Sequence, residues 1–167
     1  VAEAAPTAYI NGVWPILLNL FGESAAEEHQ ILIGYRQCGG LLEPWADEAW
    51  PHERSLLESF PVGIRGWARK EPATYCVFMA KYLDVDLLPI QRLLVMGLAE
   101  CVETCSGFAL DYICADPRRL VLGPYSDHHQ ESRALIRALV PVIVQSPTPR
   151  RGYSAVQAGL PPGGRPG

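Results

Sequence analysis

Apolar residues recur every three or four positions between residues 87 and 115, which is the spacing of one face of an α-helix. When each residue advances about 100° around the helix axis, one stripe collects apolar side chains. Its members are Ile90, Leu94, Leu98, Cys101, Val102, Cys105, Phe108, Ala109, Tyr112 and Ile113. We predict a long central amphipathic helix with Asp86 as its N-cap. A straight helix of this length spans about 40 Å, so we expect a bend or a division at Gly97 or at Ser106-Gly107.

Further helices are predicted on either side of this segment. Ser24 and Glu27 have the spacing of a capping box, and Gly39-Gly40 follows as a helix stop. Breaks are expected at Gly22 and over residues 61–66. The predicted helices cover residues 16–21, 24–38, 51–60, 72–83 and 127–144. Because no stretch shows clean period-two alternation, the sequence predicts an all-α, single-domain bundle of about five or six helices.

The composition divides the chain into three parts. Residues 1–8 are expected to form a loose N-terminal arm, and residues 9–145 form the helical domain. From residue 146 onward prolines and glycines are frequent and large apolar residues are few. This composition is typical of flexible segments, so residues 146–167 are predicted to form a flexible Pro/Gly-rich C-terminal tail.

The charge of the chain bears on the class of partner. Acidic residues outnumber basic ones by 18 to 14, and the formal net charge is −4. Nucleic-acid binding depends mainly on basic contacts with phosphate, so a nucleic-acid partner is not favoured. A membrane span is not expected either, because charged residues such as Arg92, Glu100 and Asp111 interrupt the most apolar region.

The chain has five cysteines, at positions 38, 76, 101, 105 and 114. An odd number argues against a fully paired disulfide framework, so we expect reduced thiols. Reduced thiols are typical of intracellular proteins and mildly favour that location, but they do not determine the localisation. Cys101 and Cys105 lie at i and i+4, a spacing that can start a metal site. A structural zinc site requires four ligands, however, and Cys114 lies on another side of the same helix. We therefore predict that the pair packs in the core and that the chain holds neither a metal nor a cofactor.

The sequence lacks the motifs that identify the commonest enzyme classes. It has no phosphate-binding loop, no dinucleotide-binding glycine motif, no nucleophile elbow and no His-Glu-x-x-His zinc motif. These absences favour a non-enzymatic role. The alternative is a small helical enzyme in which Cys38 pairs with His29 or His52, since such pairs form in space and not in sequence.

Tryptophans are the candidate partner-binding residues. Trp45 and Trp50 lie in an acidic segment bounded by Pro44 and Pro51, and Trp67 precedes the helix predicted at residue 72. Large aromatic side chains at element ends either pin loops to the core or anchor a partner. We predict a non-enzymatic helical interaction or assembly module that acts as an adaptor, a regulator or a structural subunit. Its partner is a protein whose identity stays open, and self-association into a homo-oligomer is a secondary expectation.

Overall fold

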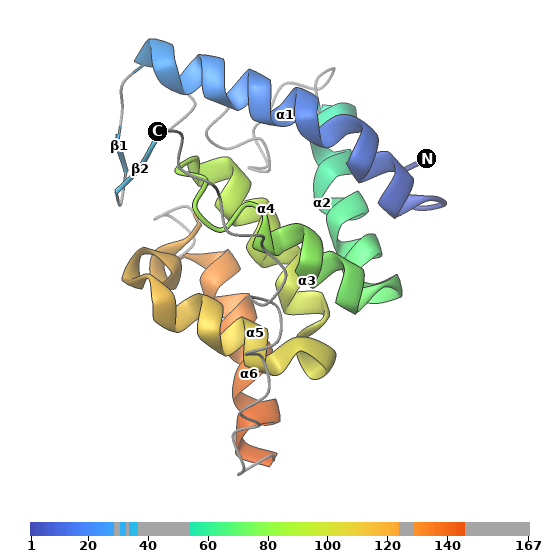
Figure 1. Ribbon diagram of the computed structural model, residues 1–167, viewed down its shortest axis with the longest axis vertical. Coiled ribbons are helices and arrows are strands. Elements are labelled where there is room, and N and C mark those ends of the chain that lie inside the picture. Colours follow the sequence, from blue (N-terminus) through green and yellow to red (C-terminus); the bar gives the residue numbers. More distant parts are fainter. Residues whose placement is uncertain (29–30, 33, 37–53, 124–128, 146–167) are drawn as a thin grey trace, which may run out of the picture.

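The computed structural model describes residues 1–28, 31–32, 34–36, 54–123 and 129–145, and α-helices dominate this part of the chain (Figure 1). Six α-helices are present among the described residues: α1 (Pro6–Glu28), α2 (Arg54–Lys70), α3 (Pro72–Ala80), α4 (Leu88–Glu100), α5 (Val102–Ala115) and α6 (Gln130–Gln145). Two short strands, β1 (Ile31–Leu32) and β2 (Tyr35–Arg36), and a 3-10 helix η2 (Pro117–Val121) join them. The predicted all-α, single-domain bundle is confirmed.

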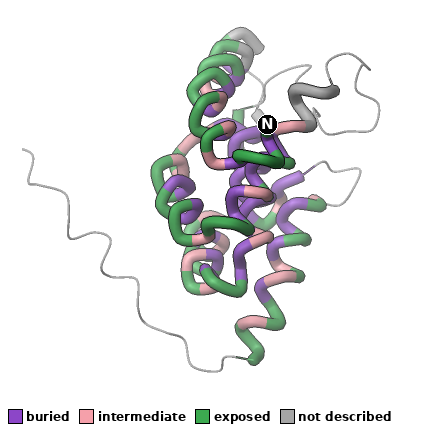
Figure 2. Tube along the Cα trace, turned by 90° about the vertical axis from the view of Figure 1, so that its right-hand side faces the viewer, coloured by how far each residue is buried: buried purple, intermediate pink, exposed green. Residues whose placement is uncertain are grey.

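The hydrophobic core lies around α4. Every residue from Leu88 to Leu98 is buried, including the polar Gln91 and Arg92, so this helix is covered on all sides. Helices α2 and α6 pack against α4, α1 packs along α2, and α5 packs against α6 and α3. Figure 2 shows buried residues on the inner faces of the helices and exposed residues on their outer faces.

Helix α1 is longer than predicted. It begins at Pro6, within the predicted arm of residues 1–8, and continues through Pro15 and Gly22 to Glu28. Its buried residues recur at helical spacing: Ile10, Trp14, Leu17, Phe21 and Ala25. Burial of this stripe offsets the backbone hydrogen bond that Pro15 removes and the low helix propensity of Gly22. The prediction of a separate helix over residues 16–21, ended by Gly22, is therefore wrong.

The predicted helix over residues 24–38 is also wrong. Ser24 lies inside α1 rather than at a helix start, and β1 and β2 pair as an antiparallel hairpin. Gly34 between the strands has a φ of +79°, a left-handed conformation that glycine adopts without a steric penalty. Arg118 donates to the Gly34 carbonyl at 2.6 Å, and its guanidinium carbon lies 4.2 Å from the Tyr35 ring centroid. A tertiary contact with η2 thus holds this segment as a hairpin.

Helix α2 includes residues 61–66, which were predicted to break the chain. Glycines in this segment allow α1 to approach closely. A Cβ atom at Gly63 would lie 2.9 Å from Tyr9 Cδ1 and 3.0 Å from Ile10 Cδ1. One at Gly66 would lie 3.3 Å from Pro6 Cβ. The packing of α1 offsets the low helix propensity of these glycines, so the helix predicted to end at residue 60 continues to residue 70.

The predicted long central helix is divided, but at neither of the expected positions. Cys101 separates α4 from α5 with φ −122° and ψ 15°, and Cys105 within α5 departs from helical geometry with φ −118° and ψ 29°. The division allows α5 to pack against α3 and α6. All members of the predicted apolar stripe are buried except Phe108 and Ile113, which are partly buried against the core.

Several helix boundaries agree with the sequence. Helix α3 begins at Pro72 as predicted, and α6 runs through Pro141 to residue 145. The N-cap of α4 is Leu87 and not Asp86, whose carboxylate instead pairs with Arg118 at 3.1 Å. The proposed N-cap Asp127 and the predicted tail of residues 146–167 lie outside the described residues.

The substitution Gly97→Ala is expected to destabilise the fold, because α4 has no room for a methyl group at this position. The added Cβ would overlap the Tyr75 ring and lie 2.8 Å from Ile64 Cγ2. Tyr75 is fully buried and donates a hydrogen bond to the Leu94 carbonyl at 2.6 Å, which restricts its movement. Overpacking of this kind costs about 1–3 kcal/mol.

Urea unfolding measures this loss, and Gly12→Ala in α1 is the matched control. Nothing lies within 4 Å of a Cβ atom added at Gly12, so this change should be neutral or stabilising. An unchanged unfolding midpoint for Gly97→Ala would contradict the described packing of α4 against α2 and α3.

Candidate functional site

Three cysteine side chains meet in the core. Cys76 lies on α3, Cys101 lies at the junction of α4 and α5, and Cys105 lies in α5. Their sulfur atoms all lie within 4.8 Å of one another. The exposed fractions of the three residues are 8%, 3% and 2% in that order. Within the described ranges, this thiol cluster is the one group of three or more Cys, His, Asp or Glu side chains able to share a metal ion.

The α4–α5 junction brings two of these thiols to the third. Cys101 and Cys105 are about one helical turn apart, so their side chains lie on the same side of the chain. The Cys101 thiol donates to the Leu98 carbonyl at 3.5 Å, and the Cys105 thiol donates to the Pro72 carbonyl at 3.7 Å. Because Pro72 begins α3, the second contact ties the junction to the helix that carries Cys76.

Mutual contact and burial favour the protonated form of two of the three thiols, those of Cys76 and Cys105. The hydrogen bond with Cys101, and then burial, raise the pKa of the Cys76 thiol far above its ordinary value. Burial, and then the contact with Cys76, raise the pKa of Cys105 to about 12. The thiolate is the nucleophilic form of cysteine, so these residues are poorly suited to nucleophilic catalysis at neutral pH. The raised pKa values therefore argue against covalent catalysis by Cys76 and Cys105, and a metal ion bound here would have to displace the thiol protons.

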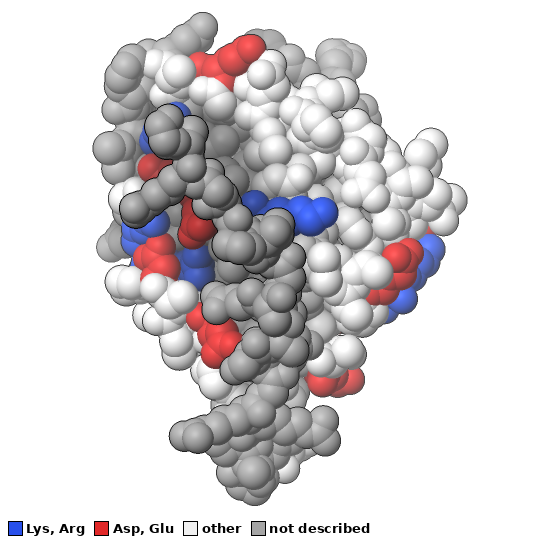
Figure 3. Space-filling model, in the orientation of Figure 1, with Lys and Arg blue, Asp and Glu red and all other residues white. Residues whose placement is uncertain are grey.

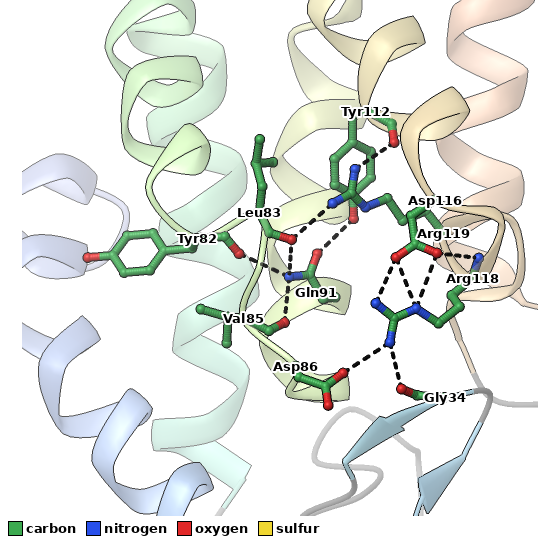
Figure 4. Close-up of polar contacts among 10 residues, drawn as sticks. All are labelled: Gly34, Tyr82, Leu83, Val85, Asp86, Gln91, Tyr112, Asp116, Arg118 and Arg119. Carbon is green, nitrogen blue, oxygen red and sulfur yellow. Dashed lines mark hydrogen bonds and ion pairs between the residues drawn. The ribbon is translucent and has the colours of Figure 1, made fainter. Parts of the chain in front are cut away.

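A second buried cluster joins α4, α5 and η2 (Figure 4). The Gln91 side-chain amide donates to the Tyr82 carbonyl at 3.0 Å, and the Tyr112 hydroxyl donates to the Gln91 side-chain oxygen at 3.0 Å. Arg119 donates to the carbonyl of Tyr112 at 2.8 Å and to that of Leu83 at 2.9 Å. Because these polar groups bond to the backbone and side chains of this chain, the cluster acts as an internal brace.

Several arginines are paired with acidic side chains. Arg118 lies 3.1 Å from Asp86 and 2.8 Å from Asp116, and Arg69 lies 2.8 Å from Glu100. The hydrogen bond from Arg118 holds the pKa of the Asp116 carboxyl below its ordinary value. On the face drawn in Figure 3, basic and acidic side chains are interspersed. Local pairing of this kind reduces the positive potential that these arginines offer to a polyanion.

The C-terminal end of α6 exposes apolar side chains. Val140, Ile143 and Val144 are 51%, 40% and 72% exposed. They lie at i, i+3 and i+4, so they share one side of the helix. This end of α6 projects beyond α5 in Figure 1 and carries largely exposed residues in Figure 2. Adjacent exposed apolar side chains are typical of contact surfaces.

The structure places one of the three tryptophans predicted to bind a partner. Trp67 is 3% exposed, and its ring packs against those of Tyr75 and Phe78. Its indole therefore offers no surface to a partner in this fold, and the partner-binding prediction does not hold for this residue. The other predicted site residues lie outside the described residues: Trp45 and Trp50 of the partner site, and Cys38, His29 and His52 of the alternative enzyme.

Sequence reasoning missed the third thiol of the cluster and the exposure of α6. The i, i+4 spacing of Cys101 and Cys105 was a partial signal, but Cys76 lies far away in the sequence and nothing near it indicates a ligand. The end of α6 also carried a signal. Residues 139–144 are apolar without interruption, whereas a helix on a bundle surface normally has one polar side.

Two features of the described residues are therefore candidates for function: the thiol cluster and the apolar end of α6. The helices in the described ranges include none that is long and apolar enough to cross a membrane. Comparison of the chain with protein-family models, with curated proteins and with solved structures finds no match.

Proposed function

We propose that this protein is a helical protein–protein interaction module that binds a partner through the C-terminal end of α6. The observation that carries the proposal is the exposed apolar face of Val140, Ile143 and Val144. Burial of apolar surface is the main favourable term in most protein association. Full burial of a side chain such as valine contributes about 1.5–3 kcal/mol relative to exposure. An adaptor, a regulator or a structural subunit can each use such a surface.

The charges beside this face indicate the kind of groove that suits it. Arg133 and Arg137 are exposed on the preceding turns of α6, and Arg137 shares one side of the helix with Val140 and Val144. Insertion of an apolar helix face into a groove is a recurring mode of protein recognition. We expect a groove on a partner protein with an apolar floor and acidic residues at the rim, close to the arginines.

The other exposed apolar residues described in the structure form smaller groups. Ile16 and Leu20 lie on α1 beside an open hollow that Pro15 also lines. Val1 precedes α1, and each of the elements α2, α3, α5 and η2 has one exposed large apolar residue: Val62, Val77, Leu110 and Leu120 in that order. Single apolar residues are normal on protein surfaces and require no partner. By contrast, three exposed apolar residues lie together at the projecting end of α6.

The double substitution Val140→Ser/Val144→Ser is expected to weaken partner binding by about 100-fold or more, since full burial of each valine contributes about 1.5 kcal/mol or more. Both valines are exposed, so the free energy of unfolding should change by less than about 0.5 kcal/mol per site. Partner recovery by the tagged full chain, followed by a binding isotherm with the recovered protein, measures the effect.

The matched control is Val62→Ser/Val77→Ser, which changes two exposed valines on α2 and α3. This control should bind the partner as the wild type does. Equal weakening by both double variants, or no weakening by the α6 variant, would show that α6 is not the binding surface. A dimer seen by sedimentation velocity and lost in the α6 variant would identify a second copy of the chain as the partner.

A further inference from the structure

We propose that Cys76, Cys101 and Cys105 bind a single Cu(I) ion through their three sulfur atoms. The inference rests on the thiol cluster alone and is independent of the surface on α6. The pair Cys101 and Cys105 without a third ligand favours packing in the core over metal binding. The third sulfur, supplied by α3, changes that expectation because it completes a ligand set of three.

The spacing of the sulfur atoms suits one central ion. Metal–thiolate bonds are about 2.3 Å long, so three sulfurs arranged around one ion lie about 4 Å apart. The observed sulfur atoms all lie within 4.8 Å of one another, so adjustments of less than about 1 Å bring them to that spacing. Such adjustments are within reach of small χ1 rotations.

The type and number of ligands select the metal. Thiolates are soft ligands that favour Cu(I), zinc and iron–sulfur clusters. Structural zinc sites use four protein ligands, and iron–sulfur clusters are held by four cysteines as a rule. Zinc sites with three protein ligands keep an open position for water, whereas the three cysteines here are at most 8% exposed. Within the described part of the chain, no imidazole, carboxylate or fourth thiol joins the three cysteines. Cu(I) is a closed-shell ion that accepts three sulfur ligands, so it matches the set without a further donor.

The irregular backbone near the α4–α5 junction falls at two of the three proposed ligands. The two departures from helical geometry at the α4–α5 junction fall at Cys101 and Cys105, which both supply sulfur atoms to the cluster. Cys114, on the same helix as Cys105, is exposed and lies outside the cluster. Three of the four cysteines in the described ranges thus converge, although packing of small apolar side chains does not require them to touch. When Cu(I) binds, the thiol protons leave to solvent, because the thiolate is the metal ligand.

The experiment is an anaerobic titration of the reduced full-length protein with Cu(I) in competition with a coloured Cu(I) chelator. The wild type and Cys114→Ser should each withdraw one equivalent of copper from the chelator. Cys76→Ala and Cys105→Ala should each bind Cu(I) about 100-fold more weakly or worse, since even outer-shell changes cost 10–100-fold. Circular dichroism of the variants identifies any loss of binding that follows from unfolding.

X-ray absorption at the copper edge tests the proposal on the wild type, without any variant. It should show three sulfur neighbours at about 2.3 Å. Less than one bound equivalent, or the same affinity in Cys76→Ala as in the wild type, would overturn the proposal. A higher affinity for Zn(II) than for Cu(I), each measured in competition with a chelator, would also overturn it. Such a preference for zinc requires a fourth ligand.

Discussion

Trp67→Ala is expected to lower the free energy of unfolding by about 3–5 kcal/mol, as other large-to-small substitutions of buried aromatic residues do. The ring centroid of Trp67 lies 4.6 Å from that of Phe78 and 5.8 Å from that of Tyr75. Its Nε1 donates to Thr74 Oγ1 at 3.1 Å. Alanine would leave a cavity between α2 and α3 and remove these aromatic contacts. Urea unfolding followed by far-UV circular dichroism measures the loss.

Two variants show whether the loss comes from packing. Trp67→Phe keeps an aromatic ring but loses the hydrogen bond, so it should cost less than the alanine variant, about 1–2 kcal/mol. Val77→Ser changes an exposed residue on the adjacent helix α3 and should have little effect. If Trp67→Ala lowered stability by less than about 0.5 kcal/mol, the indole would not be part of the core.

Arg92→Met is expected to cost about 3–5 kcal/mol, because it leaves the Glu131 carboxylate buried without its cation. Arg92 Nη2 lies 2.6 Å from Glu131 Oε1, and both side chains are only 5% exposed. A second hydrogen bond runs from Arg92 Nε to the same oxygen at 2.8 Å. The pair joins α4 to α6, so its loss weakens the contact between two helices that are distant in the sequence.

A double-mutant cycle separates the ion pair from the surrounding packing. Arg92→Met/Glu131→Leu should recover most of the loss, because replacing a buried ion pair by apolar residues is often neutral or stabilising. The coupling energy should therefore be about 2 kcal/mol or more. The exposed pair Arg69–Glu100, 59% and 29% exposed, is the control, and Arg69→Met should cost less than about 1 kcal/mol. A similar cost for Arg92→Met and Arg69→Met would contradict the prediction.

Apolar spacing was sufficient to predict the fold class and several of the helices. The stripe from Ile90 to Ile113 predicted the side of α5 that faces the core, and its members are buried or partly buried. It did not predict that α4 is buried on all sides, with Gln91 and Arg92 included. Pro72 marked the start of α3, and the spacing of Leu135 and Leu139 predicted the buried face of α6. These predictions hold because a helix in a bundle must bury one face, whichever neighbour covers it.

Proline and glycine gave the wrong boundaries in α1 and α2. Pro15 and Gly63 lower helix stability locally, and the sequence alone offers no reason to disregard them. In the folded chain, Trp14 and its neighbours bury a full helical stripe, and Gly63 provides the space for Tyr9 and Ile10. Tertiary packing therefore outweighed local propensity, because the free energy of burial exceeds the cost of one proline or glycine.

The sequence by itself determined that the chain forms amphipathic helices around one core, since periodicity is a property of each helix alone. Only the tertiary structure decided where the candidate sites lie. Cys76 meets Cys101 because α3 packs beside the α4–α5 junction, and no local pattern records that contact. Residues 140–144 are as apolar as a core helix, yet Val144 is exposed. The C-terminal end of α6 projects beyond α5 (Figure 1). A binding site and an exposed face depend on which elements are neighbours, and that is set only when the whole core closes.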